Sequence, residues 1–322
     1  MSFQSKNLSY MFNKEYYAAV TTETGDARSE TEIAAVNRAF VATGVPLEGR
    51  DLGSHSFLLQ VQYPGLLIGL GYAHQSTSLN GDIRGDLALG FSFDYVTGVP
   101  YIPGSSVKGV LRNAFTPENR GYVQAFVGDG VDVAQLELEI FGSTREDEDT
   151  AGDIFFDVFP SPDTPRVNTD GLCYLLDTDV ITPHGEGLSS TPNPLSFVKV
   201  KPGVVFDFRF QLHDGMITAA KKRALFKQIL KDFGIGAKTN VGFGVLDEVS
   251  TALRVSGGTQ PAAAQPRRSG SFPQQSPYAN NEPTRRNCSL CGRLNYKFKK
   301  DSREINANWH TQTCFSCGGK LL

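Results

Sequence analysis

One stretch near the end of the chain limits how the rest can fold. Residues 256–284 read SGGTQPAAAQPRRSGSFPQQSPYANNEPT, rich in Pro, Ser, Gln, Asn and Gly and poor in aromatic residues. Such a segment cannot bury enough apolar surface to offset the chain entropy lost on folding, so we interpret it as a flexible linker. The sequence therefore predicts a folded domain over 1–250, a linker over 251–285 and a small tail over 286–322.

Composition favours a folded, β-containing domain before that linker. The 322 residues are 40% hydrophobic and 20% charged, and the 33 Gly and 17 Pro favour a loop-rich protein over a helical bundle. No apolar run reaches the ~18–20 residues of a membrane span. The opening residues MSFQSKNLSYMF lack the charged, apolar and small-residue regions of a signal peptide. We expect a soluble, intracellular protein with no membrane partner.

The net charge of −3 is unevenly distributed along the chain. Residues 251–322 carry 11 Lys and Arg against 3 Asp and Glu, whereas residues 1–250 carry 20 against 31. A basic tail on an acidic body suggests an anionic partner for the tail. The alternative is a tail that is simply solvated.

The expected elements of the large domain indicate an α+β fold. The SSVKGVLRNAF stretch has the chemistry of a helix start at Ser105 or Ser106, and Gly234 has the character of a glycine that follows a helix end. The order of elements resembles a ferredoxin-like β-α-β-β-α-β unit with insertions. Strands are expected over 56–63, 65–73, 152–160, 203–212 and 241–250, and helices over 105–115 and 216–234.

The tail contains the most specific local pattern in the chain. CSLC is followed by 22 residues and then CFSC, which gives two Cys-x-x-Cys pairs. Four thiolates complete a closed, tetrahedral zinc site, so this zinc would be structural. A tail so short has little core, and the metal is expected to fold it. Iron in a rubredoxin-like site and redox disulfides are the alternatives. The predicted ligands of the zinc ribbon are Cys288, Cys291, Cys314 and Cys317.

The residues between the two cysteine pairs combine cations and rings. Lys and Arg alternate there with Tyr296, Phe298 and Trp309, a mixture that suits a nucleic-acid strand. The alternative is that the three rings form the tail's own small core. The fifth cysteine, Cys173, is expected to be a small core residue rather than a reactive thiol.

A glycine-rich stretch, GIGAKTNVGFG at 234–244, has the chemistry of an anion-binding loop. A Walker A loop places Gly before Lys-Ser/Thr and lies between a strand and a helix. Here Ala237 precedes Lys238, and the loop follows a helix, so nucleotide binding is not expected. The glycines permit close backbone approach, and an extended loop suits a polymer backbone better than a triphosphate. The candidate RNA-binding residues of this loop are Gly234, Gly236, Lys238, Thr239 and Asn240.

A second anion-binding candidate is the start of the helix in GVPYIPGSSVKGVLRNAF. A helix N-terminus offers free N–H groups and the positive end of the helix dipole, here joined by the hydroxyls of Ser105 and Ser106. Lys108 and Arg112, spaced i, i+4, share one helix face. The alternative is an ordinary capped helix with two solvated cations.

Together, these two stretches resemble the RAMP superfamily of CRISPR proteins. Within it, the chain is similar to the family of sixth subunits of type III-B (Cmr) effector complexes, as NLSYMFNKEYY, FDYVTGVPYIPGSS and DVITPH also indicate. The central strands GDIFFDVFP and PNPLSFVKVKPGVVFDFRF fit the same family. The resemblance covers residues 7–249, with a shortened span after DVITPH, and does not extend to the linker or the tail.

The resemblance implies a backbone subunit with an RRM-like core, which holds a guide CRISPR RNA near its 3′ end in antiviral defence. Its partners would be guide and target RNA and the other RAMP and small subunits, in the cytoplasm of a prokaryote. Contacts to phosphate fix position without reading sequence, and base pairing then supplies the specificity.

The same resemblance implies that the subunit is not an enzyme. Related subunits that cleave target RNA carry an aspartate where this chain has Ala88. Asp94 matches the structural acid of a D-x-x-T-G turn, while Asp82 and Asp86 are out of register. We expect no catalytic residue and no nucleophile motif.

Two alternatives belong to other classes of function. One is a RAMP-type endoribonuclease, in which His74, His184 or Asp86 would carry the cleavage. The other is a scaffold that recruits a partner protein through the zinc ribbon.

Overall fold

The computed structural model of the chain describes residues 3–69, 77–78, 81–142, 152–181 and 194–249, and two short strands at 285–287 and 294–296. The chain divides into two compact units, Met1–Gly258 and Thr259–Leu322. Each unit is described by itself. The described helices are α1 (Leu8–Tyr10), the π-helix η1 (Met11–Glu15), α2 (Tyr16–Val20), α3 (Glu30–Val41), α4 (Gly104–Asn113), α5 (Arg120–Val127), α6 (Val133–Phe141), α7 (Ala219–Phe233) and the 3₁₀ helix η2 (Thr239–Val241).

The centre of the first unit is an antiparallel sheet in the order β4-β8-β1-β9, with β5 also paired to β8. In β8, side chains alternate between a buried and a half-exposed face, because successive residues of a strand point to opposite sides. The strands of this sheet are β1 (His55–Val61), β4 (Ile154–Phe155), β5 (Phe159–Pro160), β8 (Val205–Gln211) and β9 (Leu246–Asp247).

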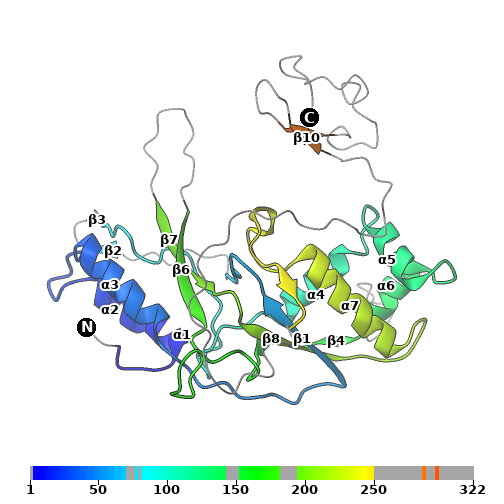
Figure 1. Ribbon diagram of the computed structural model, residues 1–322, viewed down its shortest axis with the longest axis horizontal. Helices are drawn as coiled ribbons and strands as arrows, with labels where there is room; N and C mark the ends of the chain where they lie inside the picture. Colours follow the sequence, from blue (N-terminus) through cyan, green and yellow to red (C-terminus); the bar gives the residue numbers. More distant parts are fainter. Residues whose placement is uncertain are drawn as a thin grey trace, which may run out of the picture. The chain divides into compact units, whose positions relative to one another are not determined.

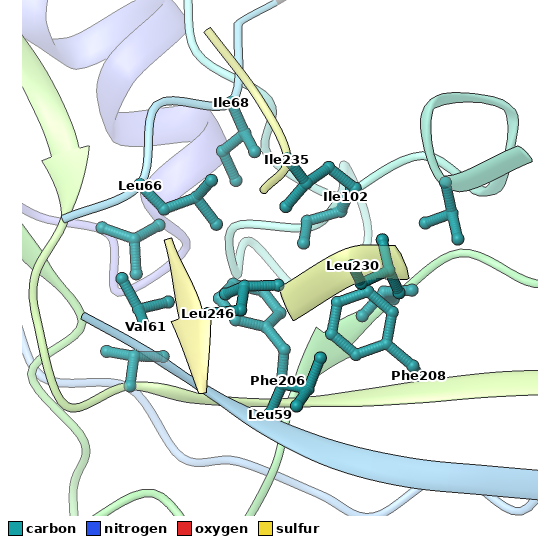
Figure 2. Close-up of a cluster of buried hydrophobic side chains, with 14 of the residues drawn as sticks. Leu59, Val61, Leu66, Ile68, Ile102, Phe206, Phe208, Leu230, Ile235 and Leu246 are labelled. Atoms are coloured by element: carbon teal, nitrogen blue, oxygen red, sulfur yellow. The ribbon is translucent and has the colours of Figure 1, made fainter. Parts of the chain in front are cut away.

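The main core lies where α7 and α4 pack beside this sheet. Helix α7 contacts α4 and β1 (Figure 1), and it buries an apolar stripe at helical spacing that includes Leu225, Phe226 and Ile229. Figure 2 shows Leu59, Phe206 and Phe208 from the sheet beside Leu230 of α7. Burial of this stripe holds α7 in place, and α7 leads directly into the glycine-rich loop.

The first unit also contains a hairpin that is separate from the main sheet and lies beside helix α3. Strands β6 (Leu176–Ile181) and β7 (Leu195–Val200) pair antiparallel, and α3 contacts β6. Helix α3 begins with a capping box in which Ser29 and Glu32 bond reciprocally to backbone N–H groups. In Figure 1 helices α1–α3 gather at one end of the unit and α4–α7 at the other.

Most expected elements agree with the structure, and the α+β class with antiparallel sheets is confirmed. The helix expected over 216–234 is α7, which begins after its N-cap Thr218 and ends before Gly234. The strands expected over 56–63 and 203–212 are β1 and β8. The strand expected over 152–160 is present as the two short strands β4 and β5. Of the strand expected over 241–250, only β9 is present among the described residues, because Val241 ends the 3₁₀ helix η2 and residues 242–244 form a turn.

One expected strand, over 65–73, is wrong for the part that the structure describes. Residues 65–69 form only one isolated bridge, between Leu66 and Val200. Their backbone groups bond instead to three separate segments: Leu66 to Val200, Leu67 O to Ala237 N, and Ile68 O to Ser92 N. The run is apolar because it is buried under its neighbours. Residues 70–73 lie outside the described residues.

In the second unit, β10 (Arg285–Asn287) pairs antiparallel with β11 (Leu294–Tyr296). The six residues between these strands in the sequence include Cys288 and Cys291. All four predicted zinc ligands lie outside the described residues. In the first unit Cys173 is buried, 1% exposed, as expected for a core residue.

Two shorter strands, β2 (Thr77–Ser78) and β3 (Gly81–Asp82), form a small ladder of their own.

None of the helices in the described segments has the length and apolar character needed to cross a membrane.

Candidate nucleic-acid interface

A groove of about 1020 Å³ brings the two predicted anion-binding stretches together. It is lined by residues from four segments, 67–69, 89–92, 102–113 and 233–239. Four of the predicted RNA-binding residues are part of the lining: Ser106, Gly234, Gly236 and Thr239. Among the described residues that line the groove, none is charged. The groove itself therefore suits neutral groups, and any phosphate has to meet its charge partner at the rim.

Helix α4 divides its residues among three faces, as the helical repeat requires. Gly104, Val107 and Leu111 are buried, while Ser106, Gly109, Val110 and Asn113 line the groove. Ser105, Lys108 and Arg112 lie on the third face. The two cations predicted from sequence therefore do not line the groove.

These two cations already have partners within the protein. Lys108 Nζ donates to the carbonyl oxygen of Phe141 at 3.0 Å and lies 5.8 Å from the ring centroid of Phe155. Arg112 Nε pairs with Glu137 Oε1 at 3.3 Å. The partners Phe141 and Glu137 both belong to α6, so these contacts hold α4 against α6. An RNA phosphate would have to compete with these partners for either cation.

The start of α4 differs from the expected serine cap. The helix begins at Gly104 after Pro103, and Gly104 N–H donates to Asp157 Oδ1 at 2.7 Å. Ser105 and Ser106 are exposed within the first turn, and their hydroxyls make no hydrogen bond in the described part of the chain. A carboxylate thus already satisfies one free N–H at this helix end. Asp157 was missed because no local pattern links it to a helix 53 residues earlier.

Hydrogen bonds to neighbouring backbone fix the glycine-rich loop. Ile235 N–H donates to Gly244 O at 3.0 Å, Ala237 N–H to Leu67 O at 2.9 Å, and Gly244 N–H to Gly65 O at 2.8 Å. Close approach follows from the missing side chains, since a Cβ at Gly236 or Gly244 would overlap a backbone carbonyl oxygen. These two glycines therefore let the loop approach the protein itself.

The exposed crest of the loop, residues 236–241, presents hydrogen-bond donors. Lys238 is the one non-glycine residue with positive φ in the described segments, at φ 60°. Its side chain is exposed and forms no ion pair or hydrogen bond there. The backbone N–H groups of Gly236, Lys238, Thr239 and Asn240 have no acceptor among the described residues. Successive N–H groups around a left-handed residue form a concavity that binds anions.

Of the candidate catalytic residues His74, His184 and Asp86, Asp86 is the one that the structure describes, and it is buried, 7% exposed. Asp94 accepts hydrogen bonds from Thr97 N–H and Oγ1–H, and its carbonyl oxygen accepts from Gly98, which confirms the expected turn. Ala88 N–H donates to Ser196 O at 3.1 Å. His74, His184 and the side chain of Asp82 lie outside the described residues.

The sequence also matches proteins of known family. A family model described as the RAMP superfamily matches residues 58–247, from β1 to β9. The CRISPR system CMR subunit Cmr6 of Saccharolobus solfataricus is 29% identical over 164 residues, 49% of this chain and 48% of the relative. The CRISPR system Cmr subunit Cmr6 of Pyrococcus furiosus is 26% identical over 208 residues, 47% of this chain and 58% of the relative. The chain thus spans about half the length of the curated relatives it matches.

Two solved structures show partial likeness. A chain of the cryo-EM structure of the Type III-B Cmr-beta bound to cognate target RNA has 27% identity and a TM-score of 0.40, over 61% of this chain and 58% of that chain. The crystal structure of Cmr6 from Pyrococcus furiosus has 22% identity and a TM-score of 0.36, over 61% of this chain and 98% of that chain. The curated relatives and the matched family confirm the resemblance inferred above from the motifs.

Proposed function

Because the chain belongs to the RAMP superfamily, we propose that it is a non-catalytic, RNA-binding backbone subunit of a type III-B CRISPR effector complex. It holds the guide RNA near the 3′ end in antiviral defence. Its partners are guide and target RNA and the other RAMP and small subunits of the complex, in the prokaryotic cytoplasm. Relatives that carry the name of a Cmr subunit support this assignment.

The groove between α4 and the glycine-rich loop is the observation that carries the proposal. Its uncharged lining suits sugars and bases, while Lys238 and the free N–H groups of the crest suit phosphates at the rim. Phosphate contacts position a strand without reading its sequence. A subunit that accepts guides with different spacers requires this kind of contact.

The topology supports an RRM-like core for this domain. In the sequence, helix α4 follows β1 and helix α7 follows β8. The order β4-β8-β1-β9 puts β1 and β8, the first and third strands of the ferredoxin-like unit, at the centre of the sheet. This is the split arrangement of a β-α-β-β-α-β unit, with α5, α6 and the β6–β7 hairpin as insertions.

The lack of catalysis is supported by the residues where cleavage would be expected. Ala88 offers only a methyl group, and buried Asp86 is poorly placed to reach an RNA strand. Incubation with guide precursor and target RNA, with and without Mg²⁺, should leave both intact. Specific cleavage that is lost in His74→Ala, His184→Ala or Asp86→Ala would instead establish the endoribonuclease.

We further propose that Cys288, Cys291, Cys314 and Cys317 bind one structural Zn²⁺ per chain. Four thiolates are a complete donor set for zinc, and the paired strands β10 and β11 flank the first two cysteines in the sequence. Metal analysis should give about one zinc per chain, and chelation should unfold the tail. Iron, or no metal, would contradict the site.

The scaffold alternative is tested by deletion of residues 251–322. If the tail only adds RNA contacts, the truncated protein should lose part of its RNA affinity and keep its protein partners. Intact RNA binding together with loss of one protein partner would instead assign the tail to recruitment.

The main test of the proposed function is sequencing of RNA that co-purifies with the tagged protein from its own cells. Short RNAs that share one repeat-derived tag and differ in spacer are expected. Heterogeneous RNA, or none, would contradict a guide-loaded effector subunit.

A further inference from the structure

Tyr63 is a large aromatic side chain that the fold leaves in solvent. It lies just after β1, in a turn closed by the hydrogen bond from Gly65 N–H to Gln62 O at 2.9 Å. Its side chain is 85% exposed. In the described part of the chain, it forms no hydrogen bond, ion pair or ring contact. A single exposed aromatic residue is common on protein surfaces, so its meaning depends on its neighbours.

The turn that carries Tyr63 is fastened to the glycine-rich loop on both sides. Gln62 N–H donates to Val245 O at 2.9 Å, and Gly244 N–H donates to Gly65 O at 2.8 Å. A Cβ on Gly242 would lie 3.7 Å from Cδ of Pro64, the residue bonded to Tyr63. The ring is therefore presented from a fixed backbone.

The short helix η2 lies between Lys238 and Gly242, the residue next to the turn that carries Tyr63. Lys238 precedes η2, and its carbonyl oxygen accepts from Val241 N–H at 3.1 Å. The next residue, Gly242, is the one beside Pro64. Val241 and Val245 are 69% and 41% exposed, so apolar surface lies at the same end of the loop. Residues 236–245 thus carry a cation, free N–H donors and aliphatic surface, and the turn hydrogen-bonded to them carries an aromatic ring.

Proteins that hold single-stranded nucleic acid combine cations for the backbone with rings on which bases stack. We propose that Tyr63 stacks on an unpaired base of an RNA strand whose phosphate is held by Lys238 and the N–H groups of the crest. The inference rests on the proposed function and adds a base-stacking position to it. An apolar protein surface is the less favoured occupant, because it would leave the charge of Lys238 and the free N–H groups without partners.

The experiment measures binding of the full chain to a fluorescein-labelled oligouridine at several stated salt concentrations. Tyr63→Ala should weaken affinity by about 5- to 150-fold, the usual effect of removing one stacked ring. Tyr63→Phe and Tyr63→Trp should bind like the wild type because they keep a ring. Tyr95→Ala is the matched control: Tyr95 is 86% exposed, and in its contact with Asn7 only its backbone carbonyl takes part.

The salt dependence separates stacking from charge. Tyr63→Ala should leave the slope of log K against log salt unchanged, whereas Lys238→Ala should reduce it by about 0.7 for one lost phosphate contact. Photo-crosslinking of RNA that contains 5-iodouridine should also give an adduct at Tyr63.

Three results would overturn the inference. If Tyr63→Ala binds like the wild type while Lys238→Ala binds more weakly, Tyr63 does not stack and the proposed function stands. If the wild-type chain binds no RNA, the stacking position and the RNA-binding function both fail. If Tyr63→Ala keeps its RNA affinity but no longer associates with a neighbouring subunit, the ring belongs to a protein interface.

Discussion

Replacement of Gly244 by alanine tests whether close backbone packing fixes the glycine-rich loop. Gly244 has φ 73°, and a Cβ there would overlap the carbonyl oxygen of Ile235. Gly242 provides a matched control, since it has φ 96° but a Cβ would meet nothing nearer than Pro64 Cδ at 3.7 Å. Both substitutions place an L side chain in a left-handed conformation, while only one of them creates a clash.

The expected magnitudes follow from these contacts. The left-handed conformation alone costs about 1–2 kcal/mol in either variant. In Gly244→Ala the clash also breaks the hydrogen bonds from Ile235 N–H to Gly244 O and from Gly244 N–H to Gly65 O. Each such bond contributes about 0.5–1.5 kcal/mol, so Gly244→Ala should lose about 1–3 kcal/mol more than Gly242→Ala.

Urea denaturation of the two variants and the wild type measures this difference, provided that the m-value is unchanged. RNA affinity should fall more in Gly244→Ala, because the loop would leave its position beside residues 65–67. Equal free energies of unfolding for Gly244→Ala and Gly242→Ala would refute the reasoning. It would mean that the loop is not held by its approach to Ile235.

Three further predictions concern charge and backbone conformation. Lys238→Gly should raise the free energy of unfolding by about 1 kcal/mol, because it removes an L residue in the left-handed conformation. The same change should weaken RNA binding because it removes the cation. Urea denaturation tests the first effect and RNA titration the second. Lys222→Met should lower the free energy of unfolding by about 3–5 kcal/mol, because the side chains of Lys222 and Asp153 are each 1% exposed and pair at 2.9 Å. Among the described residues, the variant would leave the buried Asp153 carboxylate with only its contacts to His213 and would also remove the cation that pairs with Glu139. Lys221→Met, on the same helix, is the control. The pKa of Asp247 is lowered mainly by the hydrogen bond from Lys231. The stability that this ionised carboxylate contributes should be complete above the unfolded pKa of about 3.9 and lost as pH falls through the lower folded value. Urea denaturation between about pH 2 and 6 should therefore show a weaker acid dependence for Asp247→Asn than for the wild type.

Local sequence patterns correctly predicted the helices and strands whose signals, such as a cap or a regular apolar spacing, lie within the element itself. Helix α7 has an apolar stripe, the N-cap Thr218 and a glycine after its end, and β8 alternates along its length. The segment 65–69 was mistaken for a strand because its apolar residues are buried, while its backbone bonds to Val200 and Ala237, which are distant in sequence.

In the candidate site too, local sequence predicted some features, whereas others depend on tertiary packing. The glycine-rich loop and the start of α4 were recognised locally as anion-binding candidates, and the family resemblance joined them. Their convergence on one groove comes from the packing of α7 against α4, which no short window of sequence encodes. The engagement of Lys108 by Phe141 and the cap from Asp157 are likewise tertiary contacts.

The four segments that line the groove span residues 67 to 239, and this spacing affects how the subunit is made. A chain emerging from the ribosome cannot form the groove until the glycine-rich loop has been synthesised, close to the end of the first unit. Contacts between such distant residues form late in folding. RNA would thus bind only chains whose first unit has been completed, and its binding would stabilise that state over partly folded ones. Under the proposed function, an effector complex would therefore exclude truncated or unfinished copies of this subunit without a separate quality-control step.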